Sequence, residues 1–254
     1  MAKTPLRALA IVVALAASCG ESPSPDARSV VLITLDTTRA DVLTAFGGTR
    51  EIAPVLEALC AESVRFTNAH TVAPLTLPAH SSMFTGLYPP RHGVRANGPA
   101  RLAAAADTLA ERAAHAGFQT AAFVGALALD HDYGIAQGFE TWTQPDEESS
   151  RVTGQISDRP AGEVLFDARA WLSQRDHRRP FFLWVHLFDP HAPYAAAPRF
   201  VAQAGGSPYH GEVASLDAEL ARLVEQLRDE GFLERGSLLV VGDHGEGLGD
   251  HGED

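Results

Sequence analysis

The sequence contains few cysteines and few positive charges, and both shortages limit what the protein can be. It has 2 cysteines in 254 residues, and since Cys19 lies in the N-terminal segment, Cys60 has no partner for an internal disulfide. Lys and Arg total 20 against 32 Asp and Glu, which gives a net charge of −12. A nucleic-acid surface needs a basic patch that displaces condensed counterions, so we expect no nucleic-acid partner.

Long apolar runs are also missing, apart from a short one near the N-terminus. Residues 8–18 are apolar and follow Lys3 and Arg7, but the run is too short to span a bilayer as a mature helix. It ends in AASC, which resembles the lipobox of bacterial lipoproteins. We therefore expect residues 1–19 to be a lipoprotein-type signal peptide, with a lipid on Cys19 that reaches the membrane; a plain secretory signal is the alternative.

Residues 20–28 are polar and rich in Ser and Pro, a composition that cannot pack a core, so we expect a tether. Together with the leader, this predicts a location in the cell envelope, either lipid-anchored or secreted. The remaining residues, 29–254, are predicted to form the catalytic domain.

In that domain, patterns of buried strands alternate with patterns of helices. The apolar runs that predict strands are 29–36, 118–125, 180–189 and 237–243, and the periodic segments that predict helices are 53–63, 107–117, 160–174 and 209–231. Asp107 is the expected N-cap of its helix and Gly117 the residue just past its end. Residues 134–155 are expected to be a surface excursion. The alternation predicts an α/β fold with a mostly parallel sheet sandwiched by helices.

Acidic and imidazole side chains follow several of these strands, where ligands bind in parallel sheets. Asp36, Asp243 and His244 offer two carboxylates and one imidazole, a set suited to a divalent cation such as zinc or manganese. Thr76, at the start of a short helix, could add a hydroxyl ligand; coordination would lower the pKa of that hydroxyl and make it a nucleophile. The simpler alternative is that Thr76 caps the helix.

Four longer strings extend this pattern, and together they resemble the successive motifs of the sulfatase branch of the alkaline phosphatase superfamily. They are VVLITLDTTRADVL, TLPAHSSMFTGLYPPRHGV, FLWVHLFDPHAPY and VVGDHGEGLGDHG, and the match runs from about residue 29 to the last residue. The resemblance implies a metal-dependent hydrolase or transferase of sulfate or phosphate esters. It implies metal ligands at Asp36, Thr76, Asp243 and His244, a nucleophile at Thr76, and a substrate-contacting histidine at His191.

The sequence departs from the sulfatase pattern in four ways. The signature Cys or Ser, any residue, Pro, any residue, Arg here begins with Thr76 and ends with His80, so no formylglycine is expected. A lysine that sulfatases often carry after the second strand is missing, and Asp36 is followed by Thr37 rather than a second aspartate. These changes favour zinc or manganese with a threonine nucleophile over calcium with formylglycine. Calcium stays possible as the metal. The resemblance also implies further strands beyond Asp254, so we expect the fold to be incomplete at the C-terminus.

The roles of two histidines and the final function stay open. His191 either contacts substrate or caps a turn between two prolines; with Asp189 it could also serve a second metal. His80 either replaces the signature arginine as a catalytic residue or packs locally. The leading hypothesis is hydrolysis of a sulfate or phosphate ester, with phosphoesters favoured on chemistry. The alternatives are an inactive fragment that binds anions or a partner, and a phosphotransferase acting on envelope lipids or glycans.

Overall fold

The computed structural model describes residues 28–146 and 158–252. The predicted signal peptide and all but the last residue of the predicted tether therefore lie outside the described residues. Within the described residues, no helix is both long enough and apolar enough to span a bilayer.

Five parallel strands form one sheet in the order β3-β2-β4-β1-β5. The strands are β1 (Val30–Leu35), β2 (Gln119–Val124), β3 (Thr141–Thr143), β4 (Phe181–Leu187) and β5 (Ser237–Gly242). The central strands β1, β2 and β4 have almost no exposed residue, as continuous apolar runs covered on both faces require. The predicted parallel α/β fold is confirmed.

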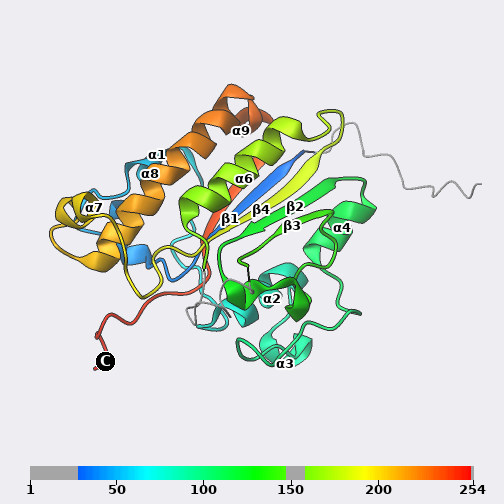
Figure 1. Cartoon of the computed structure of the whole chain (residues 1–254), viewed down its shortest axis with the longest axis horizontal. Helices are drawn as coiled ribbons and strands as arrows, with labels where there is room; N and C mark the ends of the chain where they lie inside the picture. The colour runs from blue at the N-terminus through cyan, green and yellow to red at the C-terminus, as the bar shows by residue number, and fades with distance from the viewer. Residues whose placement is uncertain (1–27, 147–157, 253–254) are drawn as a thin grey trace, which may run out of the picture.

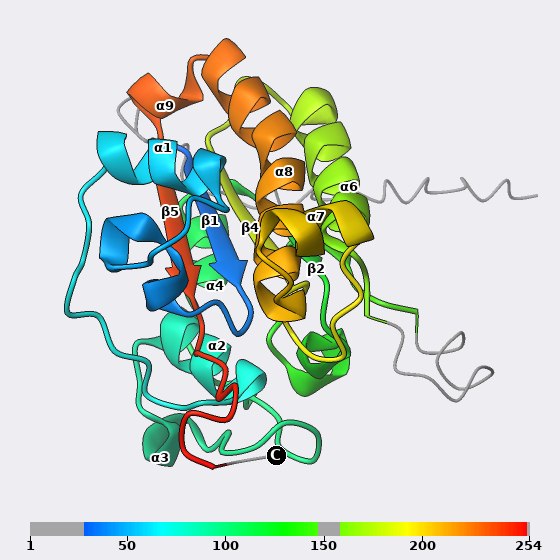
Figure 2. The same ribbon diagram turned by 90° about the vertical axis from the view of Figure 1, so that its left-hand side faces the viewer.

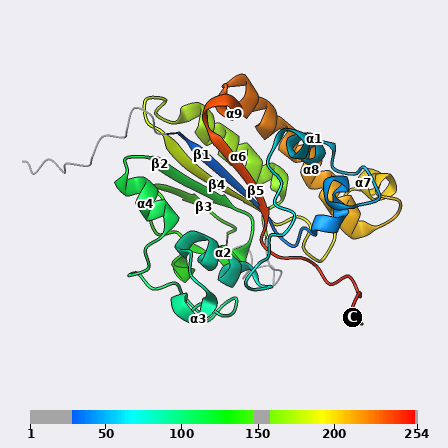
Figure 3. The same ribbon diagram turned by 180° about the vertical axis from the view of Figure 1, so that it is seen from behind.

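Helices cover both faces of the sheet, as Figures 1 and 3 show. On one face lie α1 (Pro54–Glu62), α6 (Ala161–Gln174), α8 (Pro208–Asp229) and α9 (Phe232–Arg235); on the other lie α2 (Thr76–Thr85), α3 (Pro89–His92) and α4 (Leu109–His115). The remaining elements are α7 (Pro198–Gln203) and the short 3-10 helices η1 (Ala40–Val42), η2 (Thr44–Phe46), η3 (Leu127–Leu129) and η4 (His131–Tyr133).

The sheet residues alternate between two apolar cores because successive side chains of a strand point to opposite faces. Val31 and Ile33 of β1 belong to the larger core under α6 and α8, whereas Leu32 of β1 and Trp184 of β4 belong to the core under α2 and α4. The same alternation places Thr34 on the α2 face of the sheet. Polar side chains that continue the same alternation along these strands therefore also lie on the α2 face.

Two sequence predictions about local structure are wrong. The segment predicted as a surface excursion contains β3, which pairs with β2 at the edge of the sheet. The N-cap of α4 is Thr108 and not Asp107: Thr108 accepts from the Glu111 amide, and the Glu111 carboxylate accepts from the Thr108 amide. That reciprocal pair leaves Asp107 to form an ion pair with Arg112 instead.

At the opposite edge, β5 pairs only with β1 among the described residues, and Figure 2 shows this edge of the sheet turned toward the viewer. Its side chains are less buried than those of the central strands, and Leu239 is 45% exposed. The carboxyl end of β5 nevertheless lies beside that of β1, which is what positions the candidate site.

Candidate active site

Two buried aspartates follow adjacent parallel strands. In the β1–β5 ladder Leu35 is level with Gly242, and the next residues are Asp36 and Asp243, both fully buried. Asp243 Oδ1 accepts hydrogen bonds from the Thr37 amide at 3.2 Å and the His244 amide at 2.7 Å. The parallel register therefore brings together carboxylates that are more than two hundred residues apart in sequence.

The turn after Asp36 is held in an unusual backbone conformation. Thr37 has φ 49°, a left-handed value that is costly for a β-branched residue. Tyr209 of α8 fixes this turn: its hydroxyl donates to the Thr37 carbonyl at 2.8 Å and accepts from the Arg39 amide at 2.9 Å. The conformation aims the Thr37 amide at Asp243, so it couples the loops that follow β1 and β5.

Thr76 lies against this pair at the beginning of α2. It is the first helical residue, and Leu75 holds the N-cap position, so the interpretation of Thr76 as a helix cap is wrong. Its hydroxyl donates to Asp36 Oδ2 at 3.4 Å, and the residue is 4% exposed. The first turn of the helix offers few free amides: Leu77 donates to Asn97 Oδ1, and Pro78 has no N–H.

Three buried polar atoms converge beside Thr76 without any hydrogen-bond partner in the part of the chain that the structure describes. They are Asp36 Oδ1, Asp243 Oδ2 and His244 Nε2, and the imidazole nitrogen lies 3.5 Å from the first and 3.6 Å from the second. A tetrahedral zinc site with ligands at 2.0–2.1 Å has ligand–ligand separations of about 3.3 Å. This donor set therefore fits one divalent cation, and the three residues form one of the candidate metal groups of the described chain.

The electrostatics of Asp36 and Asp243 agree with a cation site between them. Burial raises the pKa of the Asp36 carboxyl, and burial together with the charge of Asp36 raises the pKa of Asp243. Two buried carboxylates this close are costly to ionise without positive charge. A cation bound between them would reverse the effect by favouring the ionised forms.

His80, one turn after Thr76, packs locally instead of facing a substrate. It is fully buried, and each ring nitrogen has a protein partner: Nδ1 lies 2.7 Å from the Thr76 carbonyl and Nε2 lies 3.0 Å from Thr34 Oγ1. The Trp184 indole N–H donates to the same Thr34 oxygen at 3.0 Å. Because a carbonyl only accepts, Nδ1 carries the proton, so the Thr34 hydroxyl donates to Nε2.

This assignment removes His80 from the direct chemistry. Burial lowers the pKa of His80 to about 4, so the ring is neutral, and its lone pair already accepts from Thr34. A second candidate metal group, His80, His186 and Asp243, would need that same ring as a ligand. We therefore assign His80 to the positioning of the Thr76 turn, and we assign no metal to that group.

His191 and Asp189 lie beyond the end of β4. The His191 ring stacks on Phe188 with centroids 4.5 Å apart, and its Nδ1 donates to the Ala192 carbonyl at 2.6 Å. Its Nε2 makes no hydrogen bond to the described residues, and the ring is near enough to Asp36 to offset part of the increase that burial causes in the pKa of that carboxyl. Asp189 accepts from the Ala161 amide at 2.6 Å at the start of α6, so it caps that helix; a second metal at Asp189 and His191 stays a prediction.

His186 was not predicted as a site residue from the sequence. This residue lies inside β4, is fully buried, and has its Nε2 3.3 Å from Asp36 Oδ2. A titratable side chain within an otherwise apolar strand was the signal that could have identified it.

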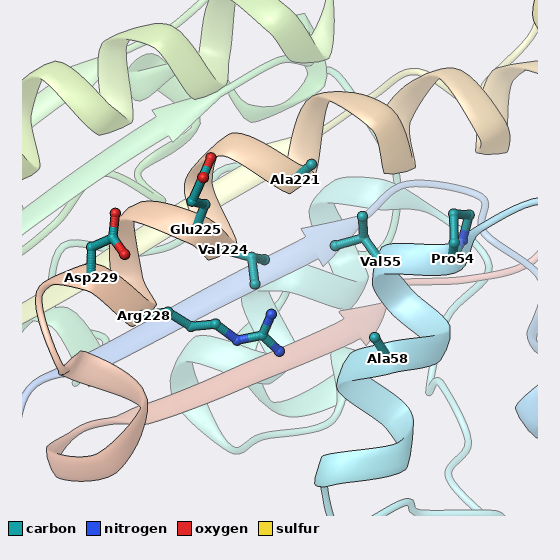
Figure 4. Close-up of a pocket in the computed structure, with 8 residues that line it drawn as sticks. All are labelled: Pro54, Val55, Ala58, Ala221, Val224, Glu225, Arg228 and Asp229. Carbon is teal, nitrogen blue, oxygen red and sulfur yellow. The ribbon is translucent and has the colours of Figure 1, made fainter.

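A separate pocket of about 450 Å³ lies between α1 and α8, as Figure 4 shows. Val55 and Val224 line it together with charged residues such as Arg228. None of the residues around Thr76 lines this pocket, so it is not part of the candidate active site.

The fold is shared with solved structures, and the family follows from the sequence match. The phosphonate monoester hydrolase of Agrobacterium radiobacter superposes with a TM-score of 0.73 at 21% identity, over 89% of this chain and 64% of that one. The Sulfatase family model matches residues 28–254, so the chain belongs to the sulfatase family.

Curated relatives include both sulfate- and phosphate-ester enzymes. The ulvan-active sulfatase of Formosa agariphila is 25% identical over 90% of this chain and 52% of its own length. Mouse ectonucleotide pyrophosphatase/phosphodiesterase family member 1 is 27% identical over 85% of this chain and 24% of its own length. The chain thus spans about half the length of the sulfatase, and a smaller share of the phosphodiesterase.

Proposed function

We propose that this sulfatase-family chain is a metal-dependent hydrolase of phosphate or sulfate esters in which Thr76 is the nucleophile. One observation carries the proposal: the Thr76 hydroxyl contacts Asp36, whose other oxygen faces the unpaired donor atoms of Asp243 and His244. A divalent cation held by those residues would lower the pKa of the hydroxyl and neutralise non-bridging oxygens of the substrate. A proposed zinc or manganese ion suits the mixed carboxylate and imidazole donors.

Thr76 and His191 have different proposed roles in the reaction. The Thr76 oxygen forms a bond to phosphorus or sulfur as the bond to the ester oxygen breaks; Thr76 loses a proton, and the leaving oxygen gains one. His191 is the proposed substrate contact through Nε2; as an imidazolium it would donate the proton that the leaving oxygen gains. Water then releases the anion from Thr76 and restores the hydroxyl.

Phosphate esters are the favoured substrates. Thr76 stands where the sulfatase signature has the cysteine or serine that becomes formylglycine, and the chain resembles a phosphodiesterase and a phosphonate monoester hydrolase as well as sulfatases. A hydroxyl held next to a cation is sufficient for attack at phosphorus.

The test uses the purified chain with zinc or manganese and the 4-nitrophenyl esters of phosphate, phosphodiester and sulfate. Thr76→Ala should abolish turnover, and Thr76→Ser should retain part of it, because only the second variant keeps a hydroxyl. Thr85→Ala is the matched control, since Thr85 lies in the same helix and donates to the Ser81 carbonyl, away from the cluster. Full activity in Thr76→Ala would refute the nucleophile, and no turnover in the wild type would favour the inactive-fragment alternative.

The same assay distinguishes hydrolysis from transfer. With glycerol present, a hydrolase releases mainly inorganic phosphate or sulfate, whereas the phosphotransferase alternative predicts a glycerol ester as the main product.

We propose a location in the cell envelope, through a lipid on Cys19. The support is the apolar leader that ends in AASC. Labelling of the expressed full chain with a radioactive fatty acid should be strong in the wild type and absent in Cys19→Ala. Equal labelling of the two proteins, or no label in either, would refute the lipid anchor.

A further inference from the structure

His186 occupies the deepest position at the candidate site. In the sheet it is level with Thr34 of β1 on one side and Val124 of β2 on the other. Its side chain shares the α2 face with Trp184 and has no exposed surface. Water therefore cannot satisfy its ring nitrogens from outside.

Neither ring nitrogen of His186 has a hydrogen-bond partner among the described residues. The His80 ring packs edge-on at 5.0 Å, but its own nitrogens are already engaged by Thr34 and the Thr76 carbonyl. Trp184 donates its only N–H to Thr34. The neighbouring rings thus leave the polar atoms of His186 unpaired.

The polar groups that His186 does approach are the two buried carboxylates. Its Nε2 lies 3.3 Å from Asp36 Oδ2, but without the alignment of a hydrogen bond. A ring nitrogen of His186 also lies within 4.8 Å of a carboxylate oxygen of Asp243, in the group that includes His80. A neutral imidazole has one N–H and one lone pair, and among the described residues no donor reaches that lone pair. A cation held by the neighbouring carboxylates would give it a partner.

We propose that His186 is an additional imidazole ligand of the cation held by Asp36, Asp243 and His244, an inference that rests on the proposed metal-dependent function. Its Nε2 lies 3.3 Å from Asp36 Oδ2, so the ring is adjacent to the carboxylate whose other oxygen faces the proposed cation. The centre then combines two carboxylates with two imidazoles, one from within β4 and one from the loop after β5. Because imidazole suits zinc and other transition metals better than calcium, His186 also sets the metal preference.

The proposal is tested by metal binding rather than by activity. The full-length chain is stripped of metal, and zinc affinity is measured by competition with a chromophoric chelator for the wild type, His186→Phe and His186→Gln. Phe keeps a buried ring, whereas Gln keeps a hydrogen-bond donor and fits the same space. Cobalt(II) is the spectroscopic probe, because its visible absorption reports the number and kind of its ligands.

We expect both variants to lose zinc affinity by about 100-fold or more, beyond the range of about 10- to 100-fold typical of residues that only support a ligand. The cobalt band should shift in position and intensity in both, and zinc-over-calcium selectivity should fall. His92→Gln is the matched control: His92 is also buried but bonds to Ser82 near α3, so its variant should bind as the wild type does.

Two results would overturn the inference. If His186→Gln binds zinc and cobalt as the wild type does, His186 is not a ligand. If the wild type binds no cation, His186 is no ligand and the metal-dependent function fails with it. If the wild type binds zinc through His186 but cleaves no ester, the proposed function fails and this inference stands.

Discussion

Thr34→Val tests the assignment of hydrogen bonds around the Thr76 turn. Valine has nearly the same shape as threonine but lacks the hydroxyl that accepts from Trp184 and donates to His80. All three side chains are fully buried, so no water can replace the lost partner. The variant leaves an indole N–H and an imidazole lone pair unsatisfied.

Each orphaned buried group costs about 1–3 kcal/mol, so with two such groups the free energy of unfolding should fall by about 2–6 kcal/mol. Urea unfolding followed by tryptophan fluorescence measures this loss, and the m-value should stay unchanged because the exposed area is the same. Thr85→Val is the control, since Thr85 bonds within its own helix and its variant should cost less than about 1 kcal/mol. A loss below about 1 kcal/mol in Thr34→Val would refute the network.

A double-mutant cycle makes the same test sharper. In a Trp184→Phe background the indole donor is already gone, so Thr34→Val should cost less there than in the wild type. We expect a coupling energy of about 1–3 kcal/mol, and additive effects of the two changes would show that Thr34 and Trp184 do not interact.

Three further changes probe the site and its supports. Asp243→Asn removes a buried charge beside Asp36, so the metal-free protein should become more stable by about 1–3 kcal/mol. Zinc should no longer raise the melting temperature of this variant. A melting temperature that still rises with zinc would exclude Asp243 as a ligand. Burial raises the pKa of Asp189 to about 7, so the contribution of this carboxyl to the free energy of unfolding is complete below pH 4 and is lost as the pH rises to 7. In urea titrations the free energy of unfolding of Asp189→Asn should therefore fall by about 2–4 kcal/mol less over this pH range than that of the wild type. An unchanged pH profile would contradict the raised pKa. Arg39 pairs with Asp250 and donates to two backbone carbonyls of the same loop. Arg39→Gln should therefore speed amide hydrogen exchange in residues 244–250 with little loss of global stability. Unchanged exchange would show that Arg39 does not hold the loop.

The elements of the sheet could be predicted from sequence wherever burial is two-sided. Val30–Leu35 and Phe181–Leu187 are continuous apolar runs because helices cover both of their faces. The strand Thr141–Thr143 escaped prediction because an edge strand of three half-buried residues has neither the length nor the periodicity that identifies a strand. Its pairing with β2 depends on the neighbouring strand rather than on its own composition.

The sequence alone determined the parallel α/β fold and the family resemblance. It also predicted Asp36, Thr76, Asp243 and His244 as site residues, because residue type and position after a strand can be read from the chain. Only the tertiary structure decided that His80 is bound on both sides by protein, and that the unpaired ring of His186 approaches Asp36. Register and face decide such contacts, and they arise when the strands pair. A histidine in an apolar strand becomes a candidate ligand only when a neighbouring strand places a carboxylate beside it.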